Sequence, residues 1–282
     1  MVPTLFLLLA VTGCATKSNN ATPPPSASAP AASPSPSPSP SPSPSPSPSP
    51  TESHTQPPAS PKPPSPSPSP KPKTGPGGSY VLTGSKDVAL TFDDGPNPEH
   101  TPHVLDLLRD NGIKATFCVI GKNAHNYPDL IRRIHADGHT LCNHSWRHDL
   151  ELRKRGDSAI RDDLAATNNA IKEAVPGAKV SYFRAPGGHF DSDLVGIARS
   201  MGMTSLYWDV DTRDWDFAKY GRGQSMVNHI VSTVQNKTRN GSIVLAHDNL
   251  KPDTVTAFRY LLPWLKSRFT LVALPPGGLG RT

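Results

Sequence analysis

The sequence from residue 80 onward predicts an α/β fold: a distorted barrel of the (β/α)7 type, with a candidate active site at the C-terminal ends of the strands. Two observations predict it. Seven short apolar segments alternate with helical patterns, which is typical of parallel strands joined by helices. Unusual polar residues directly follow several of these segments, and in a barrel the C-terminal ends of all strands meet at one rim.

Local patterns locate each element in turn. The first strand, 88–92, is continuously apolar, and Asp93-Asp94-Gly95-Pro96 after it is a strong turn signal. Thr101-Pro102 then begins a helix that Gly112 ends. The other strands are expected at 115–120, 139–143, 180–183, 204–210, 242–246 and 270–274, and the other helices at 128–137, 158–174, 191–201, 225–234 and 253–265.

Seven repeats fit either an open doubly wound sheet or an incomplete barrel. The position of the polar residues favours the barrel, because in an open sheet the outer strands would lie too far apart to share a site. The residues concerned follow the first, third, fourth, fifth and sixth strands: Asp93, Asp94, His144, His148, Arg184, Asp214 and His247.

Composition divides the chain into three parts. Residues 1–14 hold an apolar run, 5–11, that is too short to span a bilayer but typical of a signal peptide, and Cys14 resembles the lipidated cysteine of a bacterial lipobox. An ordinary signal peptide with an incidental cysteine is the alternative. Residues 15–79 are rich in Pro and Ser and predict a disordered spacer. Residues 80–282 have the composition of one globular domain.

Charge and cysteine content restrict the partners and the location. The net charge of +6 is spread along the chain without basic clusters, so no nucleic-acid partner is expected. We expect an extracellular monomer, attached only by a lipid anchor to the outer face of a bacterial cytoplasmic membrane. In an exported protein Cys118 and Cys142 are disulfide candidates, with two buried free thiols as the alternative.

Two pairs of residues indicate metal chemistry. His144 and His148 are four residues apart, so a tight loop or one helical turn can direct both rings at one point. Catalytic zinc sites commonly use two histidines and one carboxylate. Asp93 and Asp94 are adjacent carboxylates that repel each other unless a cation compensates. Since the turn needs only one aspartate, the second suggests one metal ligand and one base.

Five short motifs resemble, in order and spacing, those of the polysaccharide deacetylases, the NodB-homology proteins of carbohydrate esterase family four. The resemblance runs from about Val88 to the C-terminus and implies a distorted barrel of seven or eight β/α units. The motifs are Thr91-Phe92-Asp93-Asp94-Gly95, His144-Ser145-x-x-His148, Arg184-Ala185-Pro186-Gly187-Gly188, Asp211-x-x-Asp214-Trp215 and Leu245-Ala246-His247.

The resemblance implies a role for each matched residue. Asp94, His144 and His148 would hold one divalent metal ion, expected to be Zn²⁺, although the same ligands would accept Co²⁺ or Ni²⁺. Asp93 would be the base that activates water, and Arg184 would pair with it and fix its orientation.

The remaining matched residues would act on the substrate. His247 would protonate the leaving nitrogen, with Asp214 holding it as imidazolium. The backbone N–H of Gly187 would bind the oxyanion, at a position that is aromatic in many members of the family. Trp215 would help form a hydrophobic groove around the acetyl group, and Leu245 would also contact the substrate.

Three functions are compatible with these motifs. The expected one is N-deacetylation of peptidoglycan or of chitin-like chains of N-acetylglucosamine, because an anchored enzyme meets its own cell wall first. O-acetyl esterase activity on acetylxylan-like polysaccharide could use the same site. A non-catalytic carbohydrate-binding protein is disfavoured, because base, metal ligands and acid are all present.

Overall fold

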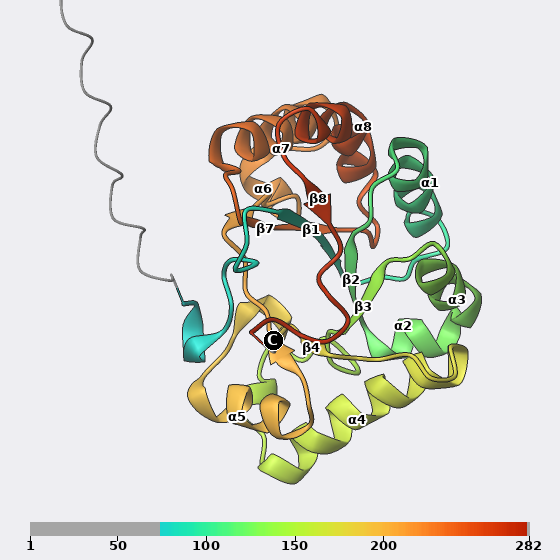
Figure 1. Ribbon diagram of the computed structural model, residues 1–282, viewed down its shortest axis with the longest axis vertical. Coiled ribbons are helices and arrows are strands. Elements are labelled where there is room, and N and C mark those ends of the chain that lie inside the picture. The colour runs from blue at the N-terminus through green and yellow to red at the C-terminus, as the bar shows by residue number, and fades with distance from the viewer. Residues whose placement is uncertain (1–73, 281–282) are drawn as a thin grey trace, which may run out of the picture. The chain divides into compact units, whose positions relative to one another are not determined.

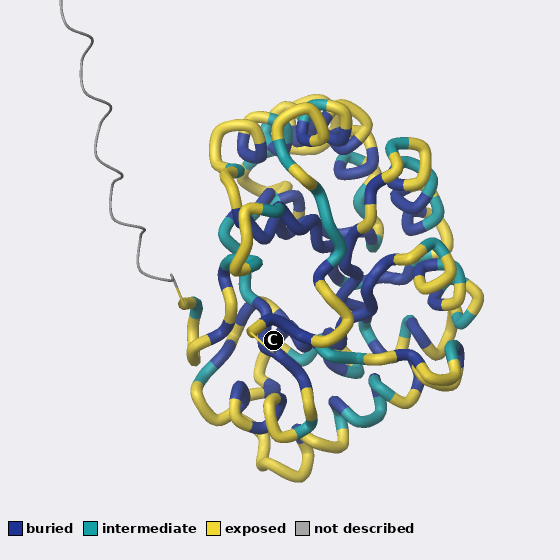
Figure 2. The backbone as a smooth tube through the Cα atoms, viewed as in Figure 1, coloured by how far each residue is buried: buried dark blue, intermediate teal, exposed yellow. Residues whose placement is uncertain are grey.

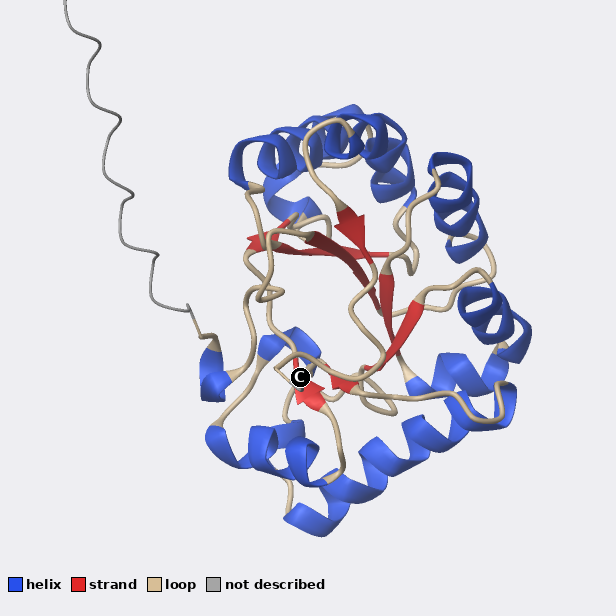
Figure 3. Ribbon diagram, in the orientation of Figure 1, coloured by secondary structure: helices blue, strands red, loops and turns tan. Residues whose placement is uncertain are grey.

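Parallel strands form one curled sheet with helices on its outer side (Figures 1 and 3) in the computed structural model, which describes residues 74–280. Within these residues the strand order is β5-β4-β3-β2-β1-β7-β6, with β8 paired to β1, and every pair of strands is parallel. The strands are β1 (Val88–Asp93), β2 (Thr116–Val119), β3 (Thr140–Asn143), β4 (Tyr182–Phe183), β5 (Thr204–Ser205), β6 (Val210–Asp211), β7 (Ile243–His247) and β8 (Leu271–Val272). The predicted distorted barrel is confirmed.

Helices follow most of the strands. The bounds of helix α1 follow from its sequence: Pro102 suits the first turn, and Gly112 ends the helix in a left-handed conformation at φ 67°. Helices α2 and α6 were not predicted, since both are too short to show a periodic pattern. The helices are α1 (Thr101–Asn111), α2 (Gly121–Asn126), α3 (Pro128–Ala136), α4 (Asp157–Ala174), α5 (Ser192–Ser200), α6 (Phe217–Tyr220), α7 (Gln224–Lys237) and α8 (Pro252–Lys266). In this part of the chain, no helix is both long and apolar enough to cross a membrane.

The predicted strand 204–210 is wrong: it is two strands at opposite edges of the sheet. Strand β5 pairs with β4, whereas β6 pairs with β7. The chain leaves the sheet between them, where Tyr207 N–H donates to the carbonyl of Tyr80 at 2.7 Å. The local sequence reads as one continuous strand and cannot show which neighbour each half will pair with. The sheet is therefore not closed by pairing between β5 and β6.

The segment before β1 lies across this opening. Tyr80 N–H donates to Ser205 at 2.9 Å, and Leu82 forms a bridge with Ser242 near β7. Ser79 is buried, and a Cβ on Gly77 would come within 2.3 Å of the Asp191 carbonyl. These contacts place the folded part as far back as Thr74, so the boundary predicted at residue 80 is a few residues late. The rest of the predicted spacer, and Cys14, lie outside the described residues.

Two apolar layers hold the sheet, and Figure 2 shows the buried residues along the strands and the inner sides of the helices. Outside the sheet, Phe92 packs on Phe117 and on Phe258 of α8, with ring centroids 5.3 and 5.1 Å apart. Inside it, Cys118 of β2 and Cys142 of β3 form a disulfide across neighbouring strands, so the alternative of two free thiols does not apply.

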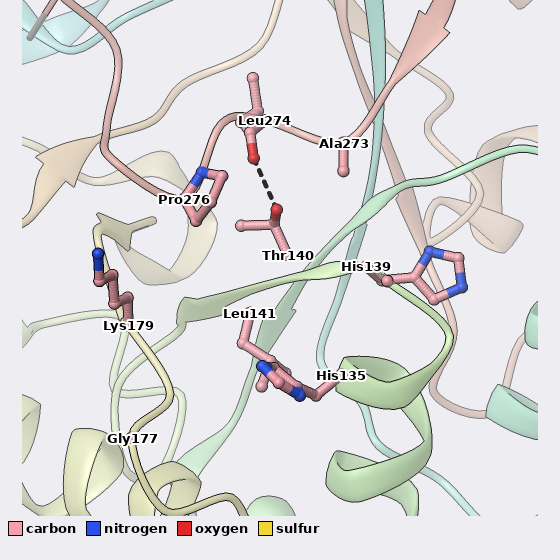
Figure 4. Close-up of a pocket in the computed structure, with 10 residues that line it drawn as sticks. His135, His139, Thr140, Leu141, Gly177, Lys179, Ala273, Leu274 and Pro276 are labelled. Carbon is pink, nitrogen blue, oxygen red and sulfur yellow. Dashed lines mark hydrogen bonds between the residues drawn. The ribbon is translucent and has the colours of Figure 1, made fainter.

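The segment after β8 covers the N-terminal end of the sheet (Figure 1). Leu274 N–H donates to Thr116 Oγ1 at 3.0 Å, and Thr140 donates to the Leu274 carbonyl at 2.6 Å (Figure 4). Leu274 and Leu279 are buried against the inner face. A hollow of about 450 Å³ remains beside this segment, at the strand ends opposite those where the predicted site residues lie.

Candidate active site

A cavity of about 380 Å³ opens at the C-terminal ends of β1, β3 and β7. Eight of the ten predicted site residues line it, and the other two, Arg184 and Asp214, lie buried behind Asp93 and His247. The eight are Asp93, Asp94, His144, His148, Gly187, Trp215, Leu245 and His247. The parallel strands bring these residues together from segments far apart in the sequence.

Asp94, His144 and His148 converge on one point. Asp94 Oδ1 lies 3.3 Å from His144 Nε2 and 3.4 Å from His148 Nε2, and the three ligand atoms all lie within 4.8 Å of one another. Asp94 Oδ1 is buried without a hydrogen-bond partner in the described chain. A buried carboxylate oxygen facing two ring nitrogens is unfavourable unless a cation lies between them.

The tautomer of His144 fits the same interpretation. Its Nδ1 lies 2.8 Å from the carbonyl oxygen of Arg184, which can only accept, so Nδ1 carries the proton. In the neutral ring, the form that binds a metal ion, Nε2 then directs a lone pair toward Asp94. Metal-bound histidines are commonly oriented by such a hydrogen bond from the other ring nitrogen to a carbonyl.

The backbone around these ligands is strained. Asp94, Ser145 and His148 have φ values of 76°, 64° and 57°, a left-handed conformation that costs roughly 1–3 kcal/mol for each non-glycine residue. Hydrogen bonds hold it in place: Ser145 Oγ accepts from His148 N–H at 3.0 Å, and Asn123 donates to the Asp94 carbonyl at 2.8 Å.

Burial opposes ionisation of Asp94, but the neighbouring histidines outweigh it and hold its pKa well below the usual range.

Asp93 is fixed by a fully buried guanidinium. Arg184 Nη1 donates to Asp93 Oδ1 at 2.6 Å and to Thr91 Oγ1 at 2.9 Å, while Nη2 donates to the carbonyl of Tyr207 at 3.1 Å. The second oxygen, Asp93 Oδ2, lies 3.7 Å from His144 Nε2 at the edge of the cavity. The arginine thus occupies one carboxylate oxygen and leaves the other available beside the candidate metal ligands.

His247 is held by Asp214 from behind. Its Nδ1 lies 2.6 Å from Asp214 Oδ1, and its backbone N–H donates to Oδ2 at 2.9 Å, which also accepts from Thr254 at 2.6 Å. Burial alone would lower the pKa of His247, but the charge of Asp214 and this hydrogen bond raise it to about 10. The carboxylate of Asp214 therefore stabilises the protonated form of His247.

The rest of the cavity wall is largely apolar. Trp208 stacks on Tyr207 with ring centroids 4.0 Å apart, and Trp215 stands at the exposed rim. Gly187 has φ 62°, and a Cβ there would lie 3.1 Å from Leu150, so glycine suits both the backbone and the space. Such a wall can hold a methyl group next to the polar centre.

Sequence analysis did not select several residues that the structure places at the site. Leu150 and His189 line the cavity although neither belongs to a recognised motif. Trp146, which lies between the two histidines of its motif, does not line the cavity and lies close against Gly121 of α2. Asp248, directly after His247 in the sequence, was also missed.

Asp248 joins three segments behind the site. Thr101 donates to its Oδ2 at 2.6 Å, and its N–H donates to the Asp93 carbonyl at 3.2 Å. A Cβ on Gly95 would lie 2.4 Å from Oδ2. Burial, together with the charges of Asp94 and Asp93, raises the pKa of Asp248 to about 7.

Comparison with known proteins identifies the family. The sequence profile described as polysaccharide deacetylase matches residues 81–206. A chitooligosaccharide deacetylase from Bradyrhizobium sp. (strain ANU 289) is 38% identical over 208 residues, which is 69% of this chain and 91% of that protein. The chain belongs to the polysaccharide deacetylase family. The predicted family is thereby confirmed.

Further relatives support this family assignment. A peptidoglycan-N-acetylglucosamine deacetylase from Bacillus cereus is 35% identical, over 67% of this chain and 85% of that protein. Among solved structures, a family 4 carbohydrate esterase from Streptomyces lividans in complex with acetate superposes with a TM-score of 0.59 at 30% identity, covering 68% of this chain and 94% of the other.

Proposed function

We propose that the protein is a metal-dependent polysaccharide N-deacetylase that hydrolyses the acetamido group of N-acetylglucosamine units in peptidoglycan or chitin-like glycan and releases acetate. One observation carries this proposal: a candidate metal triad lies in the same cavity as an arginine-held carboxylate and an aspartate-held histidine. The names of the relatives, deacetylases of chitooligosaccharides and of peptidoglycan, support the same reaction.

The two buried pairs divide the work of amide hydrolysis. A divalent ion held by Asp94, His144 and His148 would polarise the acetyl carbonyl and lower the pKa of bound water. Asp93 Oδ2 takes the proton from the attacking water, while Arg184 holds Oδ1 and prevents rotation of the carboxylate. The carbonyl carbon gains the water oxygen and the C–N bond breaks.

Protonation of the departing nitrogen is the step that distinguishes an amide from an ester. An amine leaves only as its neutral form, so the nitrogen needs a proton before the bond breaks. His247, kept protonated by Asp214, supplies it. An acetyl ester has a better leaving group and needs this donor less, which is why the His247–Asp214 pair favours N-deacetylation over O-deacetylation.

The donor set also supports a choice of metal. Two imidazole nitrogens and one carboxylate oxygen, with room left for water, suit catalytic Zn²⁺, and Co²⁺ or Ni²⁺ would bind the same ligands. We propose Zn²⁺. Export and lipid anchoring through Cys14 to the outer face of a bacterial cytoplasmic membrane, and a monomeric state, remain proposals that rest on the sequence alone.

Acetate release by the purified protein from peptidoglycan, chitin oligomers and acetylxylan, measured side by side, tests the function. We expect release from the N-acetylated glycans, loss after chelation, and recovery on addition of Zn²⁺. Release from acetylxylan alone would instead show an O-acetyl esterase. Binding to all three glycans without release of acetate from any would show a non-catalytic protein.

A further inference from the structure

A second hollow, of about 330 Å³, lies on the other side of the Asp214–His247 pair from the active-site cavity. His247 lines the active-site cavity, whereas its hydrogen-bonded partner Asp214 lines the second hollow. The loop after β6 passes from one to the other, since Trp215 stands at the first and Phe217 at the second. The two hollows are therefore neighbours on the same rim.

The second hollow exposes two large apolar side chains to solvent. Phe217 is 49% exposed and Leu250 is 61% exposed, and both line it. Leu250 is also held at φ 53°, a conformation that is uncommon for a branched residue. A ring and an aliphatic side chain offered together at the edge of an active site can pack against the C–H face of a sugar.

The polar side chains of this hollow give it a positive charge. The Arg222 guanidinium stacks over the Phe217 ring at 3.8 Å, and Lys251 also lines the hollow. Among residues 74–280 neither cation has a carboxylate within ion-pair distance, in contrast to nearby Arg213, which pairs with Asp216 at 2.9 Å. Two free cations beside an apolar platform provide an unused anion site.

The acidic groups in the hollow do not cancel this charge. Asp214 is buried and committed to His247 and Thr254. Asp253 Oδ2 accepts from the Gly223 N–H at 3.0 Å, at the start of α7. The first turns of α7 and α8 both begin here, at Gly223 and Lys251, and helix N-termini carry a partial positive charge. The remaining field therefore favours an anion.

We propose that Phe217, Arg222, Leu250 and Lys251 form an acidic-sugar subsite, which binds the carboxylate of a sugar next to the N-acetyl sugar that is hydrolysed. The lactyl carboxylate of N-acetylmuramic acid that carries no peptide has this chemistry: an anion for Arg222 and Lys251, on a pyranose whose C–H face can lie on Phe217. This inference rests on the proposed deacetylase function and narrows its substrate to glycans in which acidic sugars alternate with N-acetylglucosamine.

Three matched tetrasaccharides test the acidic-sugar subsite: alternating N-acetylglucosamine and N-acetylmuramic acid with free lactyl carboxylates, its methyl ester, and chitotetraose. The wild-type protein should show the lowest KM for the free acid. Arg222→Gln with Lys251→Gln should raise that KM by roughly tenfold or more, the size expected for charged hydrogen bonds, with kcat unchanged. The KM values for the ester and for chitotetraose should not change.

Lys237→Gln is the matched control, because this exposed lysine lies at the far end of α7, roughly 20 Å from its first turn. Equal KM values for the free acid and the ester in the wild type would overturn the subsite. So would an equal effect of the double variant on chitotetraose. Binding of the same three sugars, measured by calorimetry, tests the subsite without turnover. If no acetate is released, the deacetylase function is refuted. The binding affinities for the free acid and the ester then still show whether the subsite exists.

Discussion

His247 Nδ1 and Asp214 Oδ1 lie 2.6 Å apart, and the aspartate side chain of this pair is fully buried. His247→Ala should reduce amide hydrolysis of an N-acetylated glycan by about 10²–10⁴-fold, the range for loss of a general acid. Cleavage of an activated acetyl ester should fall much less, because its leaving group departs without a proton. Acetate release from both substrates measures the difference, and an equal loss on both would assign the proton to another donor.

Asp214→Asn should shift the basic limb of the pH–rate profile to lower pH. The charge and hydrogen bond of Asp214 contribute most to raising the pKa of His247 to about 10, with smaller contributions from Asp94 and Asp93, so His247 stays protonated as pH rises. The amide of asparagine cannot supply that charge, and His247 should lose its proton closer to its ordinary value near 6.5. The measurement is kcat/KM against pH for both proteins. An unchanged basic limb would show that another group sets it.

Asp93→Asn and Asp94→Ala should separate two kinds of loss. Asp94 lies within 3.4 Å of both histidine nitrogens, so its removal should abolish metal binding and activity together. Asp93 pairs with Arg184, and its amide variant should retain the metal and lose nearly all activity. Metal content by elemental analysis, measured beside acetate release, distinguishes them. Loss of metal from Asp93→Asn would make Asp93 a ligand.

Gly95→Ala should destabilise the fold by about 1–3 kcal/mol, the usual cost of inserting a methyl group into a packed site. The new Cβ would lie 2.4 Å from Asp248 Oδ2. Adding Asp248→Ala should recover part of the loss, because it removes the colliding carboxylate. Thermal unfolding of both single variants and the double variant measures the coupling, and purely additive effects would show that the two residues do not interact.

The sequence predicted the position of the site residues better than the edges of the sheet. Asp93, Asp94, His144 and His148 could be placed because parallel strands bring their C-terminal ends to one rim. The segment from Thr204 to Asp211 could not be divided into two strands, since pairing with β4 or β7 depends on residues far away in sequence.

Asp248 shows the same limit at the level of one side chain. Its burial arises only when the loop after β1, the start of α1 and the end of β7 come together, with Thr101 donating to it at 2.6 Å. An aspartate next to a motif histidine is more often exposed than buried, so the local pattern gave no reason to select it. Arg222 and Lys251 were missed likewise, because they are separated in the chain and meet only where α7 and α8 begin.

The segment that covers the N-terminal end of the sheet decides how a polymer can approach. Because Leu274 and Leu279 pack against the inner face of the sheet, the barrel is covered at its N-terminal end, and a glycan cannot thread through it. A long chain must lie across the open rim. Successive sugars of a β-1,4-linked chain are turned over relative to each other, so in one binding register only every second acetamido group faces the cavity. Full deacetylation of a uniform chain would therefore require release and rebinding, and short reactions should leave an alternating product.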